Sequence, residues 1–508
     1  MRSTSLTLLA LVVGAAAAVV DYSSACSGFT PTGIPNVELT NPPTYFHSNA
    51  VVDISNAYSS INESTLPAFC RVELTITTNT TAGSTALAEV WLPDNWNGRM
   101  LTVGNGGISG GVTVTELGHV AVPQGFAGVS TNTGHNGTTN EGAWAGPGND
   151  NAIVDWGWRA MHMTVIAGKE VIKQYYLTPA KKSYYLSCSN GGRQGLKEVQ
   201  EFPDDFDGVV VGSPANWWTH VQSWSIHMNL NVQPSTSPHF MMEDTWKNLI
   251  ASEVLKQCDA LDGLADGIVS DPRNCKFQPE TLLCSSGQNV STCLTEDQVS
   301  ALRNIYSDYY EGNEYVFAGY YPGGEADYYH GLVGKTQFKI GRSFFQYMVI
   351  NDTDWKIHDY NASVLALVDE INPGQGNAAS PNITAFVGPQ HNGKLIHYVG
   401  YADQLISPGN SIHYFESGGY GANAFGAVEQ ASNSNPPLSN DPEHNILSAI
   451  VRWVEEGIAP ENFTAAYYID NDVANGVGFT RPLCKYPSAL KYKSGDNSSA
   501  DSFECVLD

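Results

Sequence analysis

The chain has 508 residues, of which 42% are hydrophobic and 15% are charged, and its formal net charge is −26. The hydrophobic fraction supports a sizeable core and excludes an intrinsically disordered chain. The acidic excess repels phosphate groups, so we expect no nucleic acid and no membrane as partners, and instead a neutral polymer or a small neutral ligand. The length allows two or three domains.

The first residues have the pattern of a secretory signal peptide, which we predict over residues 1–19. Arg2 precedes an alanine-rich apolar run from Leu8 to Val20 that is too short to span a bilayer. A buried N-terminal strand or helix is the alternative. The signal peptide predicts a secreted, extracellular protein.

Secretion agrees with the cysteines and the glycosylation sequons. Most of the nine cysteines are expected to pair in an oxidising compartment. We expect N-linked glycans at some of the N-x-[ST] sequons. These sequons begin at Asn62, Asn79, Asn136, Asn289, Asn351, Asn361, Asn382, Asn462 and Asn497.

Alternating strand-like and helix-like segments follow. Short apolar runs predict strands over 99–103, 126–130, 183–188, 208–211 and 395–399. Apolar residues at helical spacing predict helices over 156–176 and 192–202, and a third from Asp441 that Gly457 and Pro460 end. This order predicts an α/β fold with a doubly wound, mostly parallel sheet.

The pattern changes over residues 214–390, which are rich in aromatic residues, Asp and Gly and contain no clear strand–helix repeat. We therefore predict three structural units after the signal peptide. Residues 20–213 form the first part of the core, 214–390 form an inserted lid domain, and 391–508 form the second part of the core.

The segment Leu186–Gly192 reads L-S-C-S-N-G-G, between a predicted strand and a predicted helix. This is the layout of a nucleophile elbow, G-x-S-x-G, with Ser187 in place of the first glycine. We predict Ser189 as the nucleophile, with an oxyanion hole formed by the backbone N–H of Asn190 and by Gly106, which follows an earlier strand. An ordinary Ser/Gly turn is the alternative.

In this fold an acid follows the nucleophile at a later strand end, and a histidine follows the acid. Asp403 fits the acid, although a plain turn carboxylate would have the same position. Only His413 and His444 come after it. His413 is too close in sequence and His444 lies in the first turn of a predicted surface helix, so no triad histidine is found.

Several motifs together resemble the fungal tannase/feruloyl esterase family, in particular its feruloyl esterase B-like members. The motifs are Cys188–Gly195 (C-S-N-G-G-R-Q-G), Gly104–Gly107, Thr133–Gly137, Gly212–Asn216, Asp403–Ile406 with Pro408–Asn410, and Gly421–Gly426. The resemblance implies an α/β-hydrolase with a large lid that cleaves esters of phenolic acids. It also implies Ser189 as nucleophile and Asp403 as acid.

One family feature is absent from the sequence. The family has a His-Cys pair just before the Gly-Ala-Asn-Ala-Phe stretch, and its cysteine bonds the cysteine beside the nucleophile. Here Ser417-Gly418-Gly419 stands in that place. An average helix and strand, which the family has between these points, need about 17 residues, more than the gap after Asp403 offers. A segment is therefore predicted to be missing near residues 416–417.

The cysteines support the same conclusion. Pairing by sequence neighbourhood gives Cys26–Cys70, Cys258–Cys275, Cys284–Cys293 and Cys484–Cys505. Cys188, beside the predicted nucleophile, is left unpaired. Its family partner lies in the missing stretch.

Residues 258–268 read C-D-A-L-D-G-L-A-D-G-I, with three carboxylates among turn glycines. Hard oxygen ligands suit Ca²⁺, whereas a solvated acidic turn is the alternative. The family resemblance implies a structural calcium ion held by Asp259, Asp262, Asp266 and the carbonyl groups of Leu264 and Ile268.

We therefore expect a secreted serine carboxylic ester hydrolase that acts on a small phenolic ester or a feruloylated polysaccharide of the plant cell wall. A tannase is the close alternative. The missing histidine leaves two further alternatives, a non-catalytic secreted glycoprotein or the product of an incorrect gene model.

Overall fold

The computed structural model describes residues 21–416 and 441–507. The predicted signal peptide, and the stretch that begins at Ser417, lie outside these residues. Within the described ranges no helix has the length and apolar character needed to cross a bilayer.

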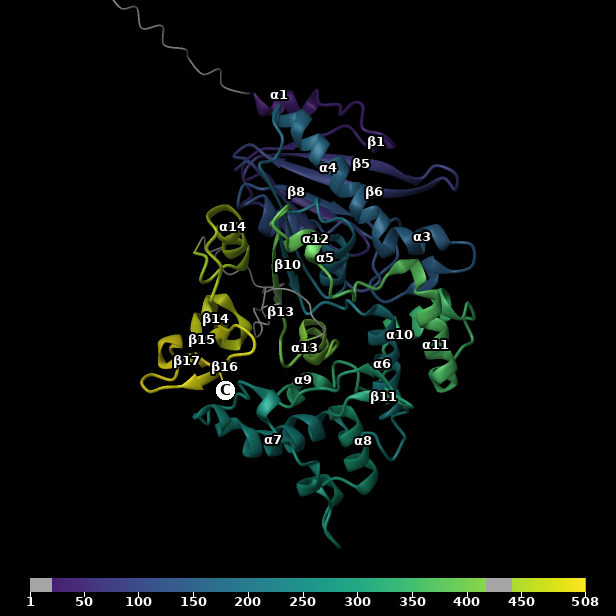
Figure 1. Cartoon of the computed structure of the whole chain (residues 1–508), viewed down its shortest axis with the longest axis vertical. Helices are drawn as coiled ribbons and strands as arrows, with labels where there is room; N and C mark the ends of the chain where they lie inside the picture. Colours follow the sequence, from purple (N-terminus) through teal and green to yellow (C-terminus); the bar gives the residue numbers. More distant parts are fainter. Residues whose placement is uncertain (1–20, 417–440, 508) are drawn as a thin grey trace, which may run out of the picture.

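A nine-stranded sheet forms the centre of the fold (Figure 1). Its order is β1 (Val37–Leu39), β5 (Phe69–Asn79), β6 (Ser84–Pro93), β8 (Ala127–Thr131), β7 (Arg99–Val103), β9 (Lys182–Cys188), β10 (Gly208–Gly212) and β13 (Lys394–Tyr398), with β2 (Thr44–Phe46) also paired to β5. The strands from β8 to β13 are parallel, and the earlier ones are antiparallel. This mixed, mostly parallel arrangement confirms the predicted α/β-hydrolase fold.

Helices cover both faces of the sheet. The helices α4 (Ala160–Tyr176) and α5 (Asn190–Glu201) pack on one face, and α14 (Ile446–Glu456) with α2 (Val114–Glu116) packs on the other. Successive residues of β10 point to opposite faces of the sheet. Val209 and Val211 pack in the core on the α4 and α5 side, and Val210 packs in the core on the α14 side. This double burial explains why the parallel strands are continuous apolar runs.

The predicted core elements are confirmed, and each strand boundary lies within one residue of the prediction. The first turn of the helix predicted over 156–176 is a π-helical segment, Asp155–Arg159, and α4 follows it. The helix predicted from Asp441 begins instead at Ile446, because the Asn445 side chain accepts a hydrogen bond from the Ser448 N–H and caps the helix there.

The segment between β10 and β13 supplies most of a further hydrophobic core, which includes the buried side chains of Trp224, Trp246 and Phe317. Ile108, Ala145, Ile153 and Trp156, from earlier in the chain, also belong to this core. Most of the segment's elements lie in the lower half of Figure 1, whereas α12 lies beside α5. The elements of the segment are α6 (Trp218–Leu230), α7 (Ala251–Cys258), α8 (Glu296–Tyr306), β11 (Tyr309–Glu311), β12 (Glu314–Phe317), α9 (Glu325–Tyr328), α10 (Lys339–Ser343), α11 (Ala362–Ile371) and α12 (Thr384–Val387). This segment corresponds in sequence to residues 214–390, for which a lid is predicted.

Two small hairpins end the chain, β14 (Asn462–Tyr468) with β15 (Val477–Cys484) and β16 (Ala489–Tyr492) with β17 (Phe503–Val506). They lie beside the lid, where Arg481 of β15 forms an ion pair with Asp266 at 2.6 Å. The remaining elements are α1 (Tyr22–Ser27), β3 (Val52–Ser55), β4 (Ser60–Glu63), α3 (Asp150–Val154) and α13 (Pro408–Glu416).

The structure contains the four predicted disulfides. They are Cys26–Cys70, Cys258–Cys275, Cys284–Cys293 and Cys484–Cys505. Cys188 is free, as predicted.

Candidate active site

Ser189 lies at the sharp turn between β9 and α5. Its backbone has φ 58° and ψ −125°, a conformation that residues with a side chain rarely adopt. The turn is held on both sides, because the Ser189 N–H donates to the Gly212 carbonyl at 2.9 Å and the Ser189 carbonyl accepts from Arg193 and Ala215. A strained serine at the start of a buried helix is the geometry that a nucleophile elbow requires.

Glycine is required close to this turn. A Cβ at Gly192 would lie 2.8 Å from the Gly212 carbonyl oxygen and 3.0 Å from Pro214. Since both contacts involve the tightly packed segment after β10, a side chain at position 192 would push α5 away from the sheet. The small residues after Ser189 therefore keep the helix N-terminus against the strand ends.

The loop that carries Gly106 is bound directly to α5. The Asn105 N–H donates to Gln194 Oε1 at 2.9 Å, and Gln194 Nε2 donates to Asn105 Oδ1 at 3.2 Å. The Asn190 side chain donates to the Asn105 carbonyl at 3.3 Å. These contacts join Asn190 to Asn105, the residue before Gly106, in one buried network.

Arg193 holds the Asn190 side chain in place by a hydrogen bond. Its guanidinium is fully buried and donates to Asn190 Oδ1 at 2.7 Å and to the carbonyl groups of Gly157 and Gly376. The ring of Trp156 lies 4.2 Å from the guanidinium carbon. Burial lowers the pKa of Arg193 to about 9, so the side chain remains a cation at neutral pH.

Asp403 lies in the turn after β13. Its carboxylate accepts hydrogen bonds from the N–H groups of Leu405 and Ile406 at 2.9 and 3.0 Å. Burial raises the pKa of this carboxyl, and these two N–H groups together with the Ser213 side chain oppose the rise. The turn thus holds an acceptor at the strand end beside the elbow.

Cys188 is the residue before Ser189, and its thiol is influenced by the Asp403 carboxylate. Its side chain reaches the surface, yet the surrounding protein, followed by the carboxylates of Glu116 and Asp403, raises the pKa of its thiol to about 11. Asp403 is therefore within electrostatic reach of the residue next to Ser189. Burial also raises the pKa of Glu116 to about 7.

All 13 histidines belong to the described residues. His413 is on α13, with its ring 4.7 Å from that of Tyr315 and 5.8 Å from that of Trp217. His444 is half exposed and pairs with Asp441 at 2.8 Å. The structure thus places the two histidines that follow Asp403 against lid aromatics and against a surface carboxylate.

The acidic loop of the lid supplies several oxygen atoms. Asp262 is buried and accepts from the Leu264 N–H and the Ser270 hydroxyl, whereas Asp259 accepts from the N–H groups of Asp266 and Gly267. Within the described residues, the carbonyl oxygens of Leu264 and Ile268 accept no hydrogen bond.

The carboxylate and carbonyl oxygens of this loop are the types of ligand that Ca²⁺ prefers. The three carboxylates are not gathered within 4.8 Å of one another, unlike the two metal-capable clusters that the described part of the chain contains. The Asp266 carboxylate instead pairs with Arg481.

Sequence reasoning did not identify Gln194 and Arg193 as parts of the site. Both are almost fully buried, and their partners lie far away in the sequence, 89 residues for Asn105 and 183 for Gly376. The available signal was the presence of Arg and Gln on the apolar face of a short helix, because buried polar side chains need dedicated partners.

Comparison with known proteins matches residues 70–506 to the family model described as tannase and feruloyl esterase. The probable feruloyl esterase B-2 of Aspergillus flavus is 33% identical over 524 residues, covering 96% of this chain and 98% of that protein. The crystal structure of feruloyl esterase B from Aspergillus oryzae is 32% identical with a TM-score of 0.87, covering 96% of this chain and all of the other. The tannin acyl hydrolase from Aspergillus niger, at 21% identity and a TM-score of 0.72 with 96% and 95% coverage, shares the fold.

Proposed function

Because the chain belongs to the tannase and feruloyl esterase family, and so to the carboxylic ester hydrolases, we propose that it is a secreted serine esterase that cleaves esters of phenolic acids such as ferulic acid. The observation that carries this proposal is the strained conformation of Ser189 between β9 and α5. An ordinary turn would relax such strain, whereas a nucleophile needs it to raise the hydroxyl above the strand ends.

In the proposed reaction the Ser189 hydroxyl attacks the ester carbonyl carbon and an acyl-enzyme forms as the alcohol leaves. Water then releases the phenolic acid. The N–H groups of Asn190 and Gly106 stabilise the oxyanion, and the Asn105–Gln194 network holds them in place. Asp403 orients the general base.

The general base is the part of the triad that this sequence lacks. The family pattern puts a histidine in the stretch that we propose is missing between Glu416 and Ser417, and Cys188 would pair with the cysteine beside it. The free Cys188 supports this proposal. An incorrect gene model explains the missing segment better than a loss of catalytic activity long ago. A site without activity would not be expected to keep its elbow and Asp403 intact.

The test compares methyl ferulate hydrolysis by the 508-residue chain and by a version with the family segment inserted after Glu416. The restored version should be active, and Ser189→Ala in it should abolish the activity. The unrestored chain should retain only about 10³–10⁴-fold catalysis over water. Full activity of the unrestored chain, or an inactive restored version that is folded, would contradict the proposal.

Methyl gallate separates the two activities within the family. A feruloyl esterase prefers methyl ferulate and a tannase prefers methyl gallate. The feruloyl esterase relative at 33% identity supports the first, since the tannin acyl hydrolase resembles the chain in fold alone. A non-catalytic glycoprotein would hydrolyse neither ester after restoration.

The acidic lid loop is proposed to bind a structural calcium ion through Asp259, Asp262, Asp266 and the carbonyl groups of Leu264 and Ile268. The two carbonyl oxygens without hydrogen bonds and the buried Asp262 carboxylate support this. The Cys258–Cys275 disulfide closes the loop. The ion would neutralise acidic charge where the lid meets the C-terminal hairpins.

A further inference from the structure

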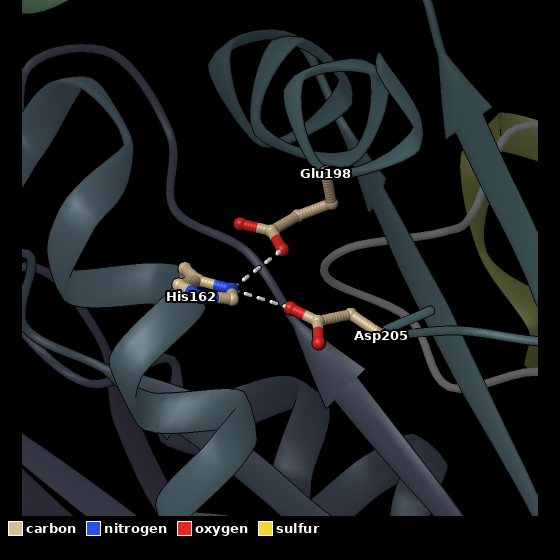
Figure 2. A group of neighbouring side chains, drawn as sticks. All are labelled: His162, Glu198 and Asp205. Atoms are coloured by element: carbon tan, nitrogen blue, oxygen red, sulfur yellow. Dashed lines mark hydrogen bonds and ion pairs between the residues drawn. The ribbon is translucent and has the colours of Figure 1, made fainter. Parts of the chain in front are cut away.

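Three metal-ligating side chains meet between α4 and α5 (Figure 2). They are His162 of α4, Glu198 of α5 and Asp205 of the loop that leads to β10, and one ligand atom of each lies within 4.8 Å of the others. Glu198 comes nine residues after Ser189, which is about 13 Å along a helix. The cluster is therefore separate from Ser189.

Glu198 is the unusual member of this cluster. It is 1% exposed, and within the described residues its carboxylate oxygens accept no hydrogen bond from a donor group. A hydrogen bond between the Glu198 and Asp205 carboxyl groups forms only when one of the two carries a proton. Figure 2 shows its carboxylate directed at the His162 ring, with Oε2 4.0 Å from Nδ1. A buried carboxylate without a partner is costly, and a bound cation removes that cost.

His162 is held in position to contribute a nitrogen ligand. Its ring stacks on Phe202 with the centroids 3.7 Å apart, and its Nδ1 lies 2.7 Å from Asp205 Oδ2. The His162 side chain is 22% exposed, so an ion has access from solvent. The stacking fixes the ring plane, and Nδ1 therefore faces both carboxylates.

Two lysines lie near the cluster, and one of them pairs with its member Asp205. Lys169 donates to the Asp204 carbonyl at 3.2 Å and lies 3.9 Å from Asp205 Oδ1. Lys197 lies 3.6 Å from Glu201 Oε1. These contacts leave the Glu198 carboxylate as the unsatisfied group of the cluster.

We propose that His162, Glu198 and Asp205 bind a divalent transition-metal ion, with Zn²⁺ as the expected occupant. One imidazole nitrogen and two carboxylates form a ligand set that zinc accepts, and water completes the coordination. The three ligands come from α4, α5 and the following loop. The ion is therefore structural and joins the two helices that cover one face of the sheet.

A proton is the competing occupant. Burial, followed by the adjacent Asp205, raises the pKa of the Glu198 carboxyl well above its usual value, so protons compete with a metal ion for this group. Zinc binding should therefore release protons, and it should be measured at pH 7.5 or above.

The test is calorimetric titration of the full chain with ZnCl₂, after chelation and return of excess CaCl₂ to saturate the lid loop. Glu198→Gln and His162→Gln should each bind one zinc ion fewer than the wild-type protein, whatever the second His/Glu/Asp group of the described residues, at His220, Glu314 and Asp369, binds. Loss of an outer-shell partner typically weakens metal affinity about 10–100-fold, so loss of a ligand should exceed that. Zinc should also raise the melting temperature of the wild type and of neither variant.

The matched control is His444→Gln. His444 pairs with Asp441 at 2.8 Å, much as His162 pairs with Asp205, but on an exposed surface without a buried carboxylate. This variant should bind zinc as the wild type does. Glu198→Gln keeps the shape of the side chain. If Glu198→Gln nevertheless folds poorly, zinc binding by His162→Gln, at a partly exposed position, tests the proposal. Absence of zinc binding by the wild type, or equal binding by both ligand variants, would overturn the proposal.

Discussion

The Gln194 carboxamide forms two hydrogen bonds with Asn105, accepting from its backbone N–H and donating to its side-chain oxygen. The pair joins the loop after β7 to the helix that follows Ser189, the proposed nucleophile. It therefore sets the distance between the two proposed oxyanion donors, which belong to separate segments of the chain.

Gln194→Leu should remove both hydrogen bonds and leave two buried polar atoms of Asn105 unsatisfied. We expect the free energy of unfolding to fall by about 1–3 kcal/mol, as measured by chemical denaturation. Equal stability of wild type and Gln194→Leu would show that the pair does not hold the loop.

The conformation of Ser189 predicts a conflict between activity and stability. Ser189→Gly should raise the free energy of unfolding by about 1 kcal/mol, because a residue held in such a conformation stores about 1–3 kcal/mol of strain. Ser189→Ala removes the hydroxyl but keeps the strain, so its stability should match that of the wild type. If the Gly variant is no more stable than the Ala variant, the elbow is unstrained.

Cys188 should be the single free thiol of the chain. Titration of the denatured, unreduced protein should give about one thiol, which peptide mapping should place at Cys188. In the folded protein its pKa of about 11 predicts slow alkylation by iodoacetamide at pH 7.5, and a rate that rises with pH up to that value.

Glu116→Gln provides a check on the cause of that shift. Removing a carboxylate that raises the pKa of Cys188 should lower this pKa and speed alkylation at pH 9. Lys173→Gln is a surface change on α4 that should leave the rate unchanged. Rapid alkylation of the wild type at pH 7 would contradict the raised pKa.

Calcium binding by the lid loop predicts a melting temperature that falls on chelation. Asp262→Asn should remove this sensitivity, because a ligand that binds only the folded state stabilises it by mass action. Asp327→Asn, at an acidic residue of the lid outside the loop, should keep the response. Identical melting curves of the wild type with and without chelator would exclude the calcium site.

Buried histidines predict a loss of stability in acid. Burial lowers the pKa of His397 to about 4, whereas an unfolded histidine has a pKa of about 6.5. The unfolded chain therefore binds the extra proton, and the free energy of unfolding should fall as the pH drops below about 6.5, by up to about 1.4 kcal/mol per pH unit for this group. His397→Gln should make that slope shallower, and the half-exposed His444→Gln should leave it unchanged. An unchanged slope in His397→Gln would refute the assignment.

The core elements were predictable because local and tertiary preferences agree in them. A continuous apolar run such as β10 has no stable alternative to a strand buried on both faces. The elbow was predictable for the same reason, since its small residues, the preceding strand and the following helix all lie within one short segment. The start of α14 was not, because the Asn445 cap outweighs the acidic residues before it.

The supporting shell of the site could not be derived from the sequence. Arg193 and Gln194 stand among ordinary helical residues, and only folding brings Asn105 and Gly376 to them. The cluster around Glu198 has the same character, since His162 lies 36 residues earlier on another helix. Such contacts depend on how the helices pack against each other, and the hydrophobic periodicity of a sequence does not specify that packing.

Arg193 also determines how the molecule should come apart. Its guanidinium donates to three acceptors in different parts of the chain. These are the Asn190 side chain of α5, the carbonyl of Gly157 in the π-helical segment before α4, and the carbonyl of Gly376 in the predicted lid. The lid cannot detach without leaving a fully buried cation short of acceptors, which is costly. Heat should therefore melt the lid and the sheet domain in a single cooperative transition, and a calorimetric scan should show one peak rather than two.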